Sequence, residues 1–143
     1  SQYEIMNKLA VLTVDDCDCP RVDTRFCGSR ECPEARGSIS GISEENFTPG
    51  KLIVGVLRGM ADELADMAKK LPETNGLLVA SGNAVRKNPT FRRIIADRFG
   101  KKLFIPVSDE ETAFGTALFA AVCAAITDIT DAKQCISYQN EEE

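Results

Sequence analysis

Residues 77–100, LLVASGNAVRKNPTFRRIIADRFG, decide the fold, because they suit a buried strand, a turn of small residues and a capped helix in direct succession. The run GLLVA at 76–80 is short and apolar and is followed by Ser-Gly-Asn at 81–83, which is typical of a strand in the interior of a sheet. Asn88 and Pro89 then supply the cap and the first residue of a helix. The stretch predicts one strand–turn–helix unit.

A long helix precedes this unit, and a second strand and helix follow it. Thr48 and Pro49 mark the start of the first helix. Its apolar positions recur every three or four residues: Leu52, Ile53, Val56, Leu57, Met60, Leu64, Met67 and Leu71. KLFIPV at 102–107 reads as a strand. Ser108 with Glu111 forms a capping-box pattern for a helix whose apolar side carries Ala113, Phe114, Ala117, Leu118, Ala121 and Val122.

The order of elements from Gly37 onward is strand, helix, strand, helix, strand, helix. This alternation predicts an α/β fold with a mixed, at least partly parallel sheet flanked by helices. We expect a helix and loop over 1–20, one domain over 21–127 that opens with strands in 21–29 and 37–42, and a frayed acidic tail over 128–143.

The composition limits the classes of partner. The chain has 143 residues, 43% of them apolar, and a formal net charge of −5, which suits a folded globular protein and disfavours nucleic acid as a partner. No apolar run approaches the length of a membrane span, and the N-terminus lacks a signal-peptide pattern. We therefore expect a cytoplasmic protein with no membrane partner.

The side chains available for catalysis are few. There is no histidine among the residues, and the cysteines number six, so any mechanism that needs an imidazole within this chain is excluded. Cys17, Cys19, Cys27 and Cys32 lie close in sequence but lack the paired CxxC spacing of zinc ribbons. Free thiols are the preferred interpretation, with zinc and disulfides as the alternatives.

The turn at Ser81, Gly82 and Asn83 is the one segment whose geometry suits a ligand. A strand that leads through a glycine turn into a helix points several backbone amides outward, and these bind phosphate groups. Gly82 would let a ligand approach the backbone closely, since it has no side chain. The alternative is that the segment is an ordinary turn with no ligand.

Three motifs between Arg21 and Ala125 resemble the C-terminal region of the FGGY family of carbohydrate kinases. FCGSRECPEARGSISGI at 26–42 is similar to a family segment of the form GxRxPxxRGxxxG, and FTPGKLIVGVLRGMADELADM at 47–67 to the helix after it. VASGNAVRKNP at 79–89 is similar to the adenosine motif, and the helix after Glu111 to the closing helix of the family. The residues of the segments SGNAVRKNP and RGSISGIS resemble those of sedoheptulokinases within the family.

The resemblance implies an actin-like, ribonuclease-H-like domain that binds ATP with magnesium. It implies that Ser81, Gly82 and Asn83 lie against the phosphates and ribose, and that Lys87 and Asn88 face the adenine side. In this family the catalytic aspartate and the sugar-binding residues belong to an N-terminal domain, so the resemblance places no catalytic residue and no metal ligand in this chain.

We therefore expect the ATP-binding portion of a kinase that transfers the γ-phosphoryl group to a sugar hydroxyl, of sedoheptulose or a related ketose, with the isolated chain inactive. The alternatives are an interaction module with an idle nucleotide loop and a dinucleotide-binding domain, although the chain contains no GxGxxG. In the family the strands near 37–42 and 76–80 are not neighbours, so we also expect either a homodimer through an exposed strand or a rearrangement of the residues before Gly37.

Overall fold

The computed structural model describes residues 1–72 and 76–140, and within them the chain forms two compact units. The first unit holds α1, β1, β2, α2 and α4, and the second holds β3, α3, β4, α5, α6 and β5.

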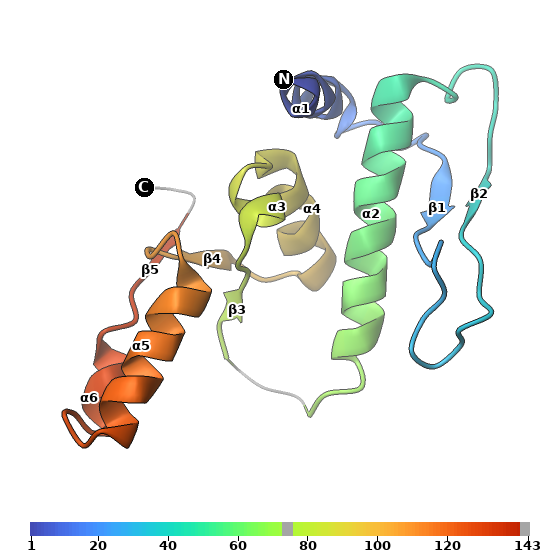
Figure 1. Cartoon of the computed structure of the whole chain (residues 1–143). Helices are drawn as coiled ribbons and strands as arrows, with labels where there is room; N and C mark the ends of the chain where they lie inside the picture. The colour runs from blue at the N-terminus through green and yellow to red at the C-terminus, as the bar shows by residue number, and fades with distance from the viewer. Residues whose placement is uncertain (73–75, 141–143) are drawn as a thin grey trace. The chain divides into compact units, whose positions relative to one another are not determined.

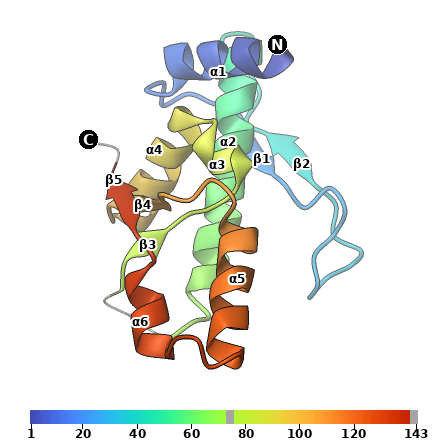
Figure 2. The ribbon, with the colours of Figure 1, turned by 60° about the vertical axis from the view of Figure 1, so that its left-hand side comes forward.

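The first unit is built around α2 (Pro49–Ala68), the long helix that the sequence predicts. Its residues Val54, Leu57 and Ala61 are buried, whereas the larger side chains of Met60, Leu64 and Met67 are exposed. The helix α1 (Gln2–Thr13) lies across the N-terminal end of α2 (Figures 1 and 2), where Ala10 is fully buried. The apolar stripe of α2 is therefore covered mainly over its first half.

The strands β1 (Arg21–Asp23) and β2 (Ser38–Ser40) form an antiparallel pair of their own. Both are shorter than the predicted strands. At the end of β1, the side chain of Asp23 accepts hydrogen bonds from the backbone and guanidinium of Arg25 and so turns the chain. The strand β1 passes directly over α2: a Cβ atom at Gly59 would lie 2.1 Å from the carbonyl oxygen of Val22. Only glycine permits this approach.

The helix α4 (Pro89–Phe99) completes the first unit and matches the prediction closely. Its apolar spacing predicts an inner face of Phe91, Ile94, Ile95 and Phe99; the first three are buried and Phe99 is half-buried. The side chain of Asn88 accepts a hydrogen bond from the amide of Phe91 at 2.9 Å and caps the helix. Local capping and apolar spacing together fix this element.

The second unit contains a three-stranded sheet in the order β3-β4-β5, which confirms the expected mixed sheet of an α/β fold. The strand β3 (Leu78–Val79) runs parallel to β4 (Leu103–Pro106), and β5 (Tyr138–Asn140) runs antiparallel to β4. Leu103 and Ile105 of β4 are buried.

The segment after Asp128 differs from the expected frayed tail. Asp128 caps α6 (Ile129–Gln134) by accepting hydrogen bonds from the amides of Thr130 and Asp131, and β5 then pairs with the edge of β4. The prediction is wrong for 129–140 because a short capped helix and one strand pairing are enough to order it. Residues 141–143 lie outside the described residues, and the expected domain boundaries at 21–127 stay a prediction.

The helix α5 (Glu111–Cys123) is apolar but unburied. None of its residues is buried, and Phe119 is 69% exposed, although the sequence predicts a packed apolar side. No helix in the described part of the chain combines the length and the apolar character that crossing a bilayer requires.

Candidate functional site

The turn that follows β3 has the open backbone that a ligand needs. Ser81 is exposed, and Gly82 has φ +95°, a conformation that side-chain-bearing residues rarely adopt. A Cβ atom at Gly82 would meet no atom within 4 Å. A phosphate or sugar group could thus approach the backbone of the turn without displacing protein atoms.

The sequence predicts that the turn leads directly into α4, and the structure differs. A one-turn helix, α3 (Asn83–Arg86), lies between them, and the carbonyl of Gly82 accepts hydrogen bonds from the amides of Val85 and Arg86 at 3.2 and 3.1 Å. It stops because Asn88 precedes a proline, which disfavours helical backbone, and Asn88 has φ −130° and ψ 89°. The N-terminus of α4 is therefore separated from the turn by α3.

Arg86 is the best-connected side chain of the site, and sequence reasoning missed it. Its guanidinium donates to the carboxylate of Glu111 through Nε at 2.9 Å and through a terminal nitrogen at 2.7 Å, and to Asp109 at 3.2 Å. It also donates to the carbonyl of Pro106 at 2.6 Å and to that of Ser108. The acidic run at 109–111 was the available signal, since it calls for a basic partner and Arg86 is the first arginine after the turn.

Glu111 does not act as a capping-box partner of Ser108, so that prediction is wrong. The N-cap of α5 is Glu110, and no side chain caps it. The carboxylate of Glu111 instead accepts from Arg86 and, at 3.5 Å, from the amide of Gly82. The hydrogen bond from Arg86 lowers the pKa of Glu111, so the carboxylate is ionised at neutral pH.

A pocket of about 460 Å³ opens beside the turn, within the second unit. Ser81 and Glu111 line it together with apolar side chains, among them Phe114, Leu118 and Tyr138. An apolar wall with a few polar groups at one edge suits a flat or partly apolar ligand.

The five residues predicted to bind nucleotide do not all belong to this turn. Ser81, Gly82 and Asn83 lie in succession at the end of β3, and Lys87 is the exposed C-cap residue of α3. Asn88 belongs to the first unit, where its side-chain oxygen is used in capping α4. The structure thus brings four of the five predicted residues together in the second unit.

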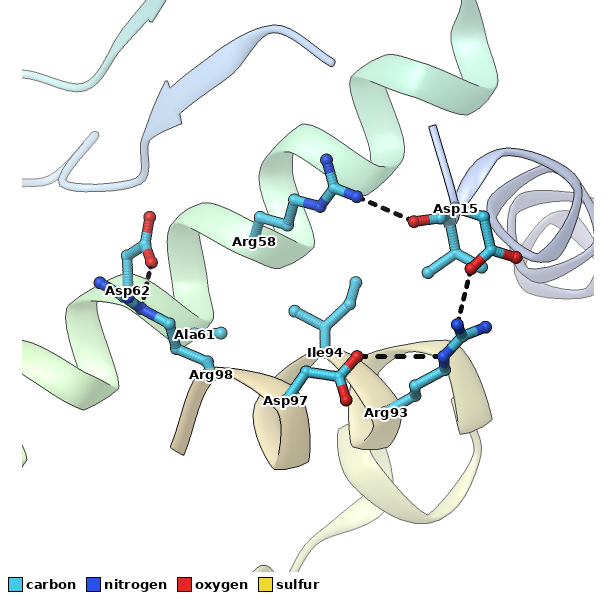
Figure 3. A pocket seen from close by; sticks show the side chains of 9 residues that line it. Asp15, Arg58, Ala61, Asp62, Arg93, Ile94, Asp97 and Arg98 are labelled. Atoms are coloured by element: carbon cyan, nitrogen blue, oxygen red, sulfur yellow. Dashed lines mark hydrogen bonds and ion pairs between the residues drawn. The ribbon is translucent and has the colours of Figure 1, made fainter. Parts of the chain in front are cut away.

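A second pocket, of about 470 Å³, lies in the first unit and is rich in charge (Figure 3). Figure 3 shows Arg93 between Asp15 and Asp97, at 2.6 and 3.9 Å, and Arg98 beside Asp62 at 2.6 Å. The remaining guanidinium, of Arg58, donates to the carbonyl of Val14 at 2.8 Å. Because each arginine already has a protein partner, we interpret this cluster as ion pairs that join α2, α4 and the segment after α1.

The described residues offer little to a metal. Residues 1–72 and 76–140 contain no group of three or more His, Cys, Asp or Glu side chains that could hold an ion. Near the turn, the carboxylates of Asp109 and Glu111 are both occupied by Arg86. We name no magnesium ligand among the described residues.

Comparison with solved structures identifies the fold. Xylulose kinase from Lactobacillus acidophilus matches with a TM-score of 0.76 and 16% identity over 96% of this chain and 29% of its own. Xylulose kinase from Rhodospirillum rubrum matches with a TM-score of 0.75 and 19% identity over 96% of this chain and 28% of its own. Glycerol kinase from Plasmodium falciparum, solved with ADP, matches with a TM-score of 0.69 and 23% identity over 92% of this chain and 29% of its own. The chain therefore spans less than a third of the length of these kinases.

The comparison of sequences identifies the family. The comparison with curated proteins finds no match. The profile of the C-terminal domain of the FGGY family of carbohydrate kinases matches residues 5–124, which is most of the chain. The α/β order of elements and the mixed sheet agree with this match. This chain belongs to the FGGY family of carbohydrate kinases and corresponds to its C-terminal domain.

Proposed function

We propose that this chain is the ATP-binding portion of a cytoplasmic carbohydrate kinase that transfers the γ-phosphoryl group of ATP to a sugar hydroxyl. The family match over residues 5–124 carries the proposal. The open backbone at Gly82, beside the pocket lined by Ser81, supports the placement of the nucleotide. Kinases of this kind act by positioning and by stabilising charge on the transferred group.

Ser81, Gly82 and Asn83 would contact the phosphates and ribose, and Lys87 and Asn88 the adenine side. Magnesium would accompany the phosphates and supply positive charge to them. The catalytic base and the sugar-binding residues are assigned to no residue of this chain. We accordingly expect the 143-residue chain alone to show no turnover with any sugar.

Titration with ADP, followed by calorimetry or by amide chemical shifts, tests the nucleotide site. Binding should be weak, because losing about 4 kcal/mol of contacts turns a micromolar site into a millimolar one. Gly82→Ala should weaken it further, since alanine at φ +95° strains the turn. Gly41→Ala is the matched control: Gly41 also has positive φ and open space around it, but lies in the first unit.

The competing functions give different results in the same titration. A dinucleotide-binding domain would bind a reduced nicotinamide cofactor in preference to ADP, and an idle interaction module would bind neither. Equal effects of Gly82→Ala and Gly41→Ala on ADP affinity would contradict the placement of the nucleotide at the 81–83 turn.

We propose sedoheptulose, or a related ketose, as the sugar. This rests on the resemblance of SGNAVRKNP and RGSISGIS to sedoheptulokinases. Kinase assays on the full-length product of the gene, with sedoheptulose, xylulose, glycerol and gluconate side by side, test it. Higher kcat/KM with any of the other three would overturn the choice of substrate and leave the kinase assignment intact.

We also propose that the chain associates into a homodimer through β3. In the sheet, β3 has β4 on one side only, and no described strand pairs with its other edge. A free edge of this kind invites pairing with a second chain. Sedimentation or light scattering across a concentration series should show association, and a monomer at every concentration would contradict the proposal.

A further inference from the structure

Arg86 joins elements that are distant in sequence but adjacent at one edge of the sheet. Its acceptors lie 20 to 25 residues further along the chain, at the end of β4 and the start of α5. Because β3 and β4 are parallel, their carboxyl ends meet at the same edge, which is where ligands bind in sheets of this type. Arg86 therefore lies between the turn after β3 and the segment after β4.

The contacts of Arg86 use the whole guanidinium. Nε and both terminal nitrogens donate, and the acceptors are two carboxylates and two carbonyls. Its side chain is only 14% exposed. A lysine could not reproduce this pattern, since an ammonium group lacks the planar fork that meets several acceptors in one plane.

The side chain of Arg86 reaches Gly82 through Glu111. The amide of Gly82 faces the carboxylate of Glu111 at 3.5 Å, and Arg86 orients that carboxylate. The carbonyl of Gly82 accepts from the backbone amides of Val85 and Arg86, which do not depend on the guanidinium. Glycine loses more conformational freedom on ordering than any other residue. A turn that is ordered before the ligand arrives avoids that cost at the moment of binding.

We propose that Arg86 is a positioning residue, which fixes the 81–83 turn against Glu111 and thereby prepares it for the phosphates of a nucleotide. The part that concerns the nucleotide rests on the proposed function. The part that concerns the order of the turn stands on the contacts of Arg86 alone.

The test uses the ¹⁵N-labelled chain and follows the amide of Gly82. Without ligand, Arg86→Ala should accelerate hydrogen exchange at this amide by about tenfold or more, because local opening replaces the fixed turn. Arg86→Lys should resemble Arg86→Ala, since the fork and not the charge holds the turn. Arg98→Ala, which removes an equally charged and paired side chain in the first unit, is the control and should leave Gly82 unchanged.

An ADP titration of the same variants supplies the second measurement. Arg86→Ala should weaken ADP binding by about tenfold, the equivalent of about 1.4 kcal/mol, and Arg98→Ala should not. Unchanged exchange at Gly82 in Arg86→Ala, or exchange of wild-type rate in Arg86→Lys, would overturn the positioning role. If the exchange responds as expected but the wild-type chain binds no ADP, the proposed function fails and the ordering of the turn by Arg86 stands.

Discussion

Replacing Asn88 with alanine and with aspartate separates capping from nucleotide binding at this position. The side-chain oxygen of Asn88 accepts from the amide of Phe91 at 2.9 Å, and Pro89 occupies the first helical position. Alanine removes this acceptor and leaves the Phe91 amide without it. Aspartate keeps the acceptor and adds a negative charge at the N-terminus of α4, where the helix dipole favours it.

The expected magnitude follows from the geometry of the cap. Loss of an N-cap side chain costs about 1 kcal/mol of the free energy of unfolding, and for a chain of this size that corresponds to a fall of about 4 °C in Tm. Asn88→Asp should match or slightly exceed the wild-type stability. Urea and thermal unfolding, followed by far-UV circular dichroism, measure both variants against the wild type.

Equal destabilisation by alanine and aspartate would refute the capping argument. An ADP titration of Asn88→Asp completes the experiment, because this variant should stay folded. If Asn88 faces the adenine side, as the resemblance implies, Asn88→Asp should weaken ADP binding without loss of stability. If its side chain serves the cap alone, ADP binding should be unchanged.

Two further predictions concern the helices and the pH dependence. Gly59→Ala should lower the free energy of unfolding by about 1 kcal/mol, since the clash with the Val22 carbonyl outweighs the gain in helix propensity. Gly115→Ala in α5, with no atom within 4 Å of the new Cβ, should raise it by up to about 1 kcal/mol. Urea titrations compare the two variants, and a gain in stability in both would contradict the close packing of β1 on α2. Because Arg86 lowers the pKa of Glu111, the stability that Glu111 adds is complete above the ordinary glutamate range and is lost as the pH falls through the lowered pKa. The difference in the free energy of unfolding between wild type and Glu111→Gln should thus be smaller at about pH 3 than at about pH 7. A difference that is independent of pH would refute this role of Glu111.

The elements that the sequence predicts well are those with local signals. α4 has a capping residue, a proline at its first position and apolar residues at helical spacing, and all three features are found in the structure. α2 begins at Pro49 as predicted. Such signals act within a few residues, so a pattern search finds them.

The features that the sequence does not predict depend on contacts between distant residues or on elements too short to show a periodic apolar pattern. α3 has four residues and no side-chain cap, and it is too short for periodicity to show. The exposed surface of α5 shows a different limit: its apolar residues predict that a face could be buried, but not what would cover it. The role of Arg86 depends on acceptors 20 to 25 residues away.

The single turn of α3 explains how the candidate site can be both exposed and ordered. Val85 is buried, and Arg86 donates to the end of β4 and the start of α5, so these two residues anchor the helix. Asn83 and Lys87, on the same turn, are exposed. A helix of four residues has no cooperative stability of its own, so its order must come from the two anchors. The residues that would meet a ligand are thus held by neighbours that would not, which separates the stability of the turn from its chemistry.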